Sequence, residues 1–137
     1  MSFDSELLEN IPTSNPNAPI LTAGKKLVET PEWTFAARAG YDITEDLKVG
    51  LQAKQVDDRF GTDLNDQVID SYTVVDLDLS YGFSMGGEKN AQIQFNVINL
   101  FDEEYYGNIS SATGGNSTAF LSIGAPRTAV ASFKFNF

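Results

Sequence analysis

From residue 33 onward the chain alternates apolar and polar residues with a period of two, and this feature constrains its fold more than any other. Successive side chains of an extended strand point to opposite faces, so such alternation predicts strands with one apolar and one polar face. We therefore expect an all-β fold, an antiparallel meander of about five long strands. The strands are expected over residues 33–43, 47–54, 72–83, 91–97 and 129–137.

The odd-numbered residues of these strands are predominantly apolar, so we expect them to form one continuous face. Its aromatic residues gather toward one end of the first, third and fifth strands, at Tyr41, Tyr81, Phe83, Phe135 and Phe137. The even-numbered face carries Arg38, Lys48, Gln52, Lys54, Asp76, Asp78, Gln92, Gln94, Asn96 and Lys134. A polar face is typical both of a solvated sheet and of the lumen of a barrel, and alternation alone does not separate the two.

The connections between the strands alternate in length, which favours the barrel. Short turns follow the first and third strands, whereas residues 57–71 and roughly 107–118 are long loops. Bacterial outer-membrane barrels have short periplasmic turns and long extracellular loops, with aromatic belts at the membrane interfaces. We therefore expect a segment of a transmembrane β-barrel. Residues 1–32 are interpreted as an extracellular-type loop with the remnant of an upstream strand, and residues 33–137 as barrel strands.

Composition excludes most other classes of function. The chain has no His and no Cys, which removes the commonest metal ligand, the usual general base and thiolate chemistry. A net charge of −10 with nine scattered basic residues argues against nucleic acid. The Asp residues of the loop over 57–71 do not have EF-hand spacing. We expect no enzyme activity, no cofactor and no metal. The mean hydropathy of −0.19 suits strands that alternate in polarity, and no signal sequence opens the chain.

Two short motifs in the last forty residues carry a family resemblance. Residues 99–106 read N-L-F-D-E-E-Y-Y, similar to the N-L-F-D-x-x-Y segment near the penultimate strand of TonB-dependent receptors. Residues 124–128 read G-A-P-R-T, similar to the G-x-P-R-T segment that opens the last strand of these receptors. A T-P-x-x-T pattern at residues 30–34 extends the likeness to roughly residues 24–137. The positions that match the family are Asn99, Phe101, Asp102, Gly124, Pro126 and Arg127.

This resemblance implies the C-terminal wall of an outer-membrane receptor that imports a scarce nutrient. Ferric siderophores are the ligands it implies first, with cobalamin and carbohydrates as further ligand classes. The implied partners are outer-membrane lipid, the barrel-assembly machinery, the imported small molecule, and TonB acting through an N-terminal plug that this sequence lacks. Tyr105, Tyr106 and Asn108 would lie near the extracellular mouth as candidate ligand contacts, although packing within the loop is the commoner role of such tyrosines. Phe137 would be the assembly signal.

Three other interpretations remain open. A soluble β-sandwich, for example a carbohydrate-binding module, requires two sheets that share one dry core. An independent small barrel needs about eight strands, and residues 1–32 are too proline-rich to supply the three that are missing. An enzyme has the least support, because the sequence offers no nucleophile with a base and no metal site.

Overall fold

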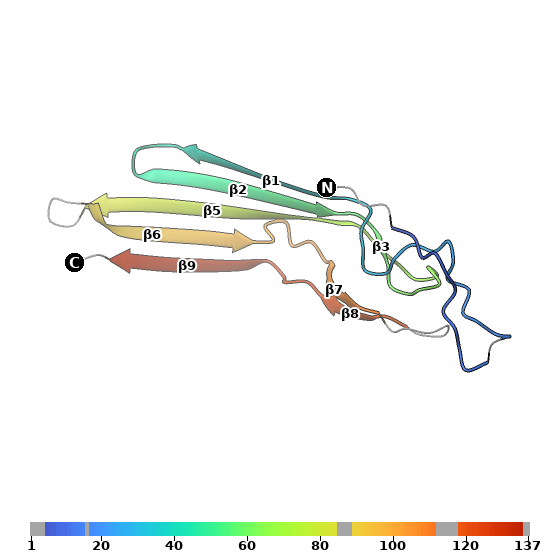
Figure 1. Cartoon of the computed structure of the whole chain (residues 1–137). Coiled ribbons are helices and arrows are strands. Elements are labelled where there is room, and N and C mark those ends of the chain that lie inside the picture. Colours follow the sequence, from blue (N-terminus) through green and yellow to red (C-terminus); the bar gives the residue numbers. More distant parts are fainter. Residues whose placement is uncertain (1–4, 16, 85–88, 112–117, 136–137) are drawn as a thin grey trace. The chain divides into compact units, whose positions relative to one another are not determined.

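The structure is a computed structural model that describes residues 5–15, 17–84, 89–111 and 118–135. Among these residues there is no helix long and apolar enough to span a membrane. The largest element is one sheet with the strand order β1-β2-β5-β6-β9, in which neighbouring strands of the meander lie side by side (Figure 1). Its strands are β1 (Thr34–Asp42), β2 (Leu47–Val56), β5 (Tyr72–Ser84), β6 (Lys89–Ile98) and β9 (Thr128–Phe135). The predicted five-stranded meander is therefore confirmed.

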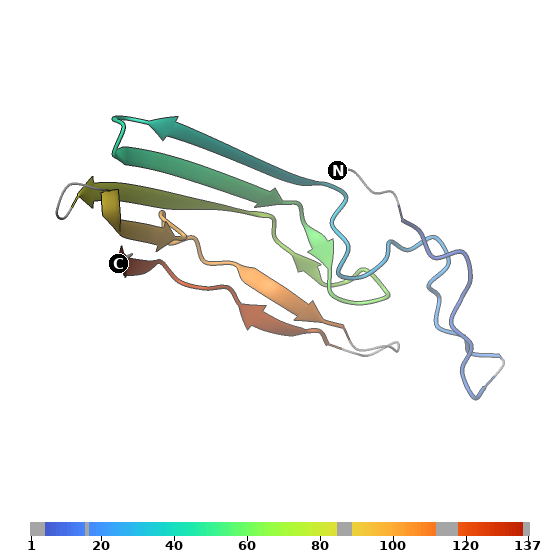
Figure 2. The same cartoon turned by 60° about the vertical axis from the view of Figure 1, so that its left-hand side comes forward.

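Two small hairpins lie within the long connections. One pairs β3 (Arg59–Phe60) with β4 (Val68–Ile69), and the other pairs β7 (Tyr106–Ser110) with β8 (Phe120–Ile123). The sequence pattern does not predict these hairpins, because strands of two to five residues are too short for alternation to stand out. The expected loops over 57–71 and 107–118 are thus partly strand. Figure 2 shows the strands of both hairpins, β3 and β4 in green and β7 and β8 in orange to red.

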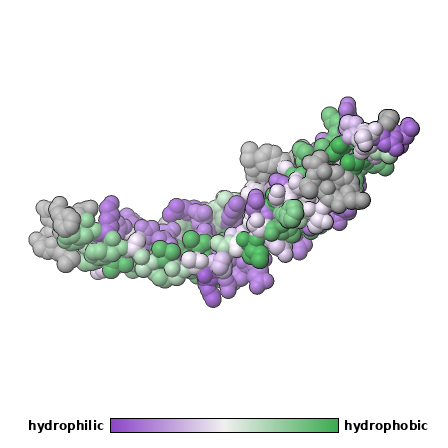
Figure 3. All heavy atoms as spheres, turned by 90° about the horizontal axis from the view of Figure 1, so that it is seen from below, coloured by the Kyte–Doolittle hydropathy of each residue, from purple (hydrophilic) through white to green (hydrophobic). Residues whose placement is uncertain are grey.

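The register of the sheet confirms the predicted parity of its faces for three strands. Leu79 of β5 lies opposite Phe95 of β6, which lies opposite Ala131 of β9. Every pairing of β6 with β9 joins two residues of the same parity. Since side chains of directly opposite residues point to the same face, the odd-numbered residues of these strands form one surface. Figure 3 shows hydrophobic residues reaching the surface along the strands.

Aromatic rings gather at one end of the odd-numbered face. The ring centroids of Tyr81 and Phe83 are 6.1 Å apart, and those of Phe83 and Phe133 are 6.2 Å apart. Phe135 continues the row, 6.4 Å from Phe133. These distances suit offset aromatic contacts, which add to the stability of neighbouring strands. Phe137, expected at the same level, lies outside the described residues.

Contacts between residues divide the chain into two compact units. The loop unit consists of Met1–Phe35, Gln55–Tyr72 and Glu104–Gly124. The sheet unit consists of Ala36–Lys54, Thr73–Glu103 and Ala125–Phe137. Within the first thirty-two residues the described pairing is limited to isolated bridges, of Glu6 with Lys26 and of Ile11 with Ile20. Each unit is therefore built from segments that are distant in the sequence.

The loop unit has a small core of its own. Ile69 of β4, Ile109 of β7 and Ala119 are buried together, and Leu121 of β8 packs against them. The backbone N–H of Ala119 also donates to Oε1 of Gln67, at 3.2 Å. Side chains from the two hairpins thus hold two long connections together.

Candidate functional site

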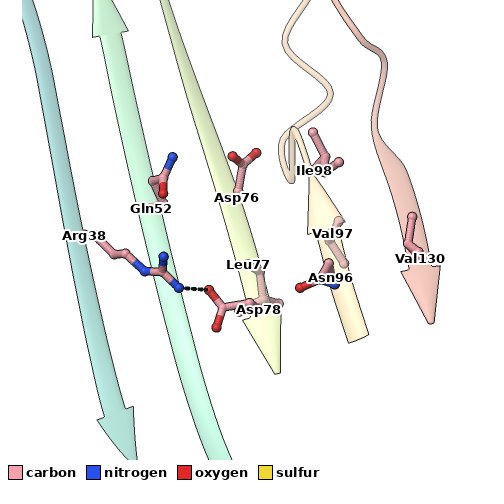
Figure 4. A pocket seen from close by; sticks show the side chains of 9 residues that line it. All are labelled: Arg38, Gln52, Asp76, Leu77, Asp78, Asn96, Val97, Ile98 and Val130. Atoms are coloured by element: carbon pink, nitrogen blue, oxygen red, sulfur yellow. Dashed lines mark hydrogen bonds and ion pairs between the residues drawn. The ribbon is translucent and has the colours of Figure 1, made fainter. Parts of the chain in front are cut away.

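The polar face of the sheet unit holds a shallow groove of about 390 Å³ (Figure 4). All five long strands of the sheet contribute to its lining. The lining residues are Arg38, Gln52, Asp76, Leu77, Asp78, Asn96, Val97, Ile98 and Val130. Seven of them have even numbers, so this is the face that alternation predicts to be polar.

An ion pair crosses this face over a glycine. Nη2 of Arg38 in β1 lies 3.2 Å from Oδ1 of Asp78 in β5, although β2 runs between these strands (Figure 4). A Cβ atom on Gly50 of β2 would lie 2.5 Å from the carboxylate oxygens of Asp78. Gly50 therefore leaves the space through which the two charges meet. Glycine weakens a strand interior, and here its use follows from this close approach.

The groove offers polar contacts rather than catalytic groups. It has one guanidinium and two carboxylates, and Oδ1 of Asp76 accepts a hydrogen bond from the backbone N–H of Asn99 at 2.9 Å. In the described part of the chain, there is no group of three or more His, Cys, Asp or Glu residues that could hold a metal ion. Asp76 and Asp78 both line the groove, on the even-numbered face where the sequence places them.

A second candidate region lies in the loop unit around Tyr105. Its ring stacks on that of Tyr72, with centroids 4.4 Å apart. The backbone N–H of Gly124 donates to the Tyr105 carbonyl at 2.7 Å, and a Cβ atom on Gly124 would lie 2.2 Å from the Tyr105 ring. The two family motifs thus meet here, because only glycine fits beneath this ring. Tyr105 packs within the loop unit.

Arg59 fixes the neighbouring backbone from inside the loop unit. Its side chain is buried, and its guanidinium lies 5.6 Å from the centre of the Tyr72 ring. Nη2 of Arg59 donates to the Tyr106 carbonyl at 2.8 Å. A guanidinium over an aromatic face is attracted to the ring quadrupole, and more strongly when both groups are away from water. Arg59 thereby joins β3 to the start of β7.

The other two candidate ligand contacts have accessible side chains. Tyr106 is 43% exposed, and Asn108 is exposed in the same strand. They lie opposite Ile123 and Ser122 of β8, with a register shift between them. The structure thus brings the three predicted residues into one hairpin region, but it gives Tyr105 a packing role that the other two do not share.

The N-L-F-D motif ends β6 in a tight turn built on Asn99. This side chain is 1% exposed, and its Nδ2 donates to the carbonyls of Glu103 at 2.9 Å and Ala125 at 3.0 Å. Its Oδ1 accepts from the backbone N–H of Glu103 at 2.8 Å. The backbone φ of Asn99 is 53°, in the left-handed region that Asn tolerates better than most residues. Every polar atom of the buried amide therefore has a partner.

Asp102 completes the turn and contacts the second motif. Its φ is 58°, and its Oδ1 accepts from the backbone N–H of Arg127 at 2.9 Å. The guanidinium of Arg127 lies 4.0 Å from Oδ2 of the same carboxylate. Phe101, at the tip of the turn, is 72% exposed, and Pro126 directly precedes Arg127. Within the sheet unit, the two motifs are therefore bonded to each other.

Comparison with known proteins identifies the same family that these motifs resemble. A protein-family model described as "TonB dependent receptor-like, beta-barrel" matches residues 9–100. The chain belongs to this family. TonB-dependent receptors are transport proteins of the outer membrane, and the soluble sandwich is not favoured.

Individual relatives point the same way. The ferrioxamine B receptor of Salmonella typhimurium is 30% identical over 118 residues, which cover 83% of this chain and 16% of that protein. The ferric-catecholate import receptor Fiu of E. coli K12, in its closed form, is 28% identical with a TM-score of 0.63, covering 84% of this chain and 16% of that one. The siderophore receptor PiuA of Acinetobacter baumannii shares the fold with a TM-score of 0.78 at 24% identity, covering 96% and 18%. The chain thus spans about a sixth of the length of these receptors.

Sequence reasoning missed Arg59 and the ion pair over Gly50. A glycine inside an alternating strand is a recognised sign of close approach, and Gly50 carries that sign. Arg59 is the one basic residue in an otherwise acidic segment, Gln55–Tyr72, which singles it out in the sequence. Neither signal identifies the partner, because Asp78 and Tyr106 come from distant segments.

Proposed function

We propose that this chain is part of the wall of an outer-membrane receptor that imports a ferric siderophore by a TonB-dependent mechanism. The observation that carries the proposal is the family membership combined with an exposed apolar sheet face. Phe35, Tyr41, Leu51, Phe95 and Phe133 are 38–72% exposed, although all are large and apolar. Lipid would cover such a face, because hydrocarbon removes apolar surface from water as a protein core does.

The relatives support the ligand class. One is a ferrioxamine B receptor and another imports a ferric catecholate, so an iron complex is the ligand that we propose first. Cobalamin and carbohydrate are the alternatives that uptake measurements would separate from it. The polar groove would then face the lumen, and the long connections would lie on the extracellular side, as their length favours.

Five strands do not close a barrel, so the proposed receptor includes further strands and a plug. The edges of β1 and β9 carry backbone groups that need partners within a bilayer, where each unsatisfied group costs several kcal/mol. TonB would act through the plug, and the assembly machinery would insert the barrel with Phe137 as its signal. Within the loop unit, Tyr106 and Asn108 are the proposed ligand contacts, because their side chains are accessible.

The test is iron uptake by the complete receptor. Cells that lack their own siderophore receptors should take up radiolabelled iron when they express it, and only while TonB is present. A matched pair of variants, Asn108→Ala and Asn17→Ala, separates ligand contact from general loop damage, since both asparagines are exposed in the loop unit. We expect only Asn108→Ala to weaken binding. Uptake of cobalamin or a carbohydrate without iron uptake would overturn the ligand class.

A separate measurement tests the membrane wall. Expressed alone without detergent, the chain should aggregate, because large apolar side chains are exposed along the described strands of its sheet. A monodisperse monomer that unfolds cooperatively in plain buffer would contradict the proposal and favour the sandwich.

A further inference from the structure

The pairing of β6 with β9 raises a question of register. Eight residue pairs join these strands, from Ala91 opposite Phe135 to Ile98 opposite Thr128. A hairpin of two residues sets its register through the turn, but β6 and β9 are joined by the long segment of residues 99–127. Loop-closure entropy changes only slowly with length, so this connection does not select one register.

The alternation of polarity does not by itself select one register of β9 on β6. A slip by one residue would move every apolar side chain of β9 to the polar face, and such a slip is strongly disfavoured. A slip by two residues keeps all parities. Gln94 would then lie opposite Val130 or Lys134 instead of Ser132, and all of these belong to the same face. Something other than parity must reject the slipped registers.

The turn after β6 makes bonds that depend on register. Asn99 Nδ2 donates to the carbonyl of Ala125 at 3.0 Å, and Asp102 Oδ1 accepts from the N–H of Arg127 at 2.9 Å. Both partner atoms belong to the backbone directly before β9. A slip of two residues moves this backbone by roughly 7 Å along the strand, so neither bond survives it. Pro126, between the two partners, has no N–H to extend the ladder in their place.

We propose that Asn99 and Asp102 form a clasp that sets the register of β9 on β6. Asn99 suits this role because it is 1% exposed and held by two further bonds to Glu103. Those bonds are made within the turn itself and hold the amide without any contact with β9. In a slipped register its Nδ2 would lose the Ala125 carbonyl, and a buried donor without a partner is costly. The exposed Phe101 lies in the same turn and takes no part in the clasp.

Engineered disulfides read the register directly, since this chain has no cysteine. Opposite residues in a sheet have Cα atoms about 4.5–5.5 Å apart, within disulfide range, whereas diagonal neighbours at about 7–8 Å lie beyond it. In the complete receptor, Gln94→Cys is combined with Ser132→Cys for the native register. For the slipped registers Gln94→Cys is combined with Val130→Cys or with Lys134→Cys. The yield of each disulfide after oxidation is measured in outer-membrane fractions.

With the clasp intact, and in the control variant Phe101→Ala, we expect only the native pair to form a disulfide. In the double variant Asn99→Ala with Asp102→Ala, we expect the native yield to fall several-fold and a slipped pair to form a disulfide. An undiminished native yield with no slipped disulfide would overturn the proposal. The same pairs are oxidised in receptor refolded into detergent, so that a variant degraded in cells still gives a result. Failure of iron uptake with unaltered disulfides would count against the proposed function and not against the clasp.

Discussion

The loop unit and the sheet unit bury their residues in opposite ways. The loop unit is polar and proline-rich in sequence, yet it holds Val56, Ile69, Tyr72, Ile109 and Ala119, five of the seven buried apolar side chains among the described residues. The sheet unit has long apolar strands, yet it buries only Ala91 and Val97 of this set. The loop unit therefore packs around a small apolar core of its own, whereas the sheet unit leaves large apolar side chains such as Tyr41 and Phe133 exposed.

Charge follows the same division. The loop unit carries eleven of the nineteen acidic residues but only three of the nine basic ones. In the sheet unit, charges of both signs are nearly balanced, with six basic and eight acidic residues. The comparison shows that the two units are stabilised differently: the sheet by its backbone ladder and the clasp, the loops by side chains.

The largest expected effect tests the clasp in the sheet unit. Asn99→Asp places a carboxylate oxygen where the amide donates to two carbonyls, so two bonds are lost. A buried charge then faces those carbonyl oxygens, with only the N–H of Glu103 still donating to it. We expect the free energy of unfolding to fall by about 3–5 kcal/mol. The measurement is urea unfolding of the complete receptor refolded in detergent, with Phe101→Ala as the control. A loss below about 1 kcal/mol would show that the turn contributes little.

The next effect should be confined to the loop unit. Arg59→Ala removes the bond to the Tyr106 carbonyl and the contact with the Tyr72 ring, and we expect local opening to become easier by about 2–3 kcal/mol. Hydrogen exchange should accelerate in the loop unit and stay unchanged in β5 and β6. The matched control is Arg38→Ala, whose side chain is 67% exposed. Faster exchange throughout the sheet would contradict the division into two units.

A smaller effect is expected beneath Tyr105. In Gly124→Ala the new methyl group would overlap the Tyr105 ring, and displacing the ring should cost about 1–3 kcal/mol. Gly82→Ala is the control, because a Cβ atom at Gly82 meets nothing within 4 Å. Near-ultraviolet circular dichroism of the tyrosines would follow the ring in both variants. Equal stability of the two variants would mean that Tyr105 moves aside at no cost.

The smallest effect concerns the ion pair across Gly50. A double-mutant cycle with Arg38→Ala and Asp78→Ala should give a coupling of about 0.2–1 kcal/mol, because the two side chains are 67% and 33% exposed. Added salt should reduce the coupling further. A coupling well above this range, insensitive to salt, would show that the groove is shielded from water in the complete receptor.

The strands and their two faces could be predicted because each depends on a short stretch of sequence. The alternation in β1, β2, β5, β6 and β9 is local, and it predicts both the strands and their facing. The motif residues Asn99 and Gly124 could be recognised, but their roles could not, since their partners Ala125 and Tyr105 come from the other motif. The roles of the ligand-contact candidates Tyr106 and Asn108 stay predictions.

Sequence by itself determined an all-β chain with an apolar and a polar face, because side-chain direction in a strand depends only on parity. Tertiary structure alone decided that Arg38 reaches Asp78 over Gly50 and that Arg59 holds Tyr106. It alone also decided that Asn99 bonds to the backbone before β9. These pairs are separated by 26 to 47 positions in the chain, and their contacts exist only once the strands and hairpins have been brought together. No local sequence pattern specifies these contacts, since they depend on the register of the strands and on how the hairpins pack.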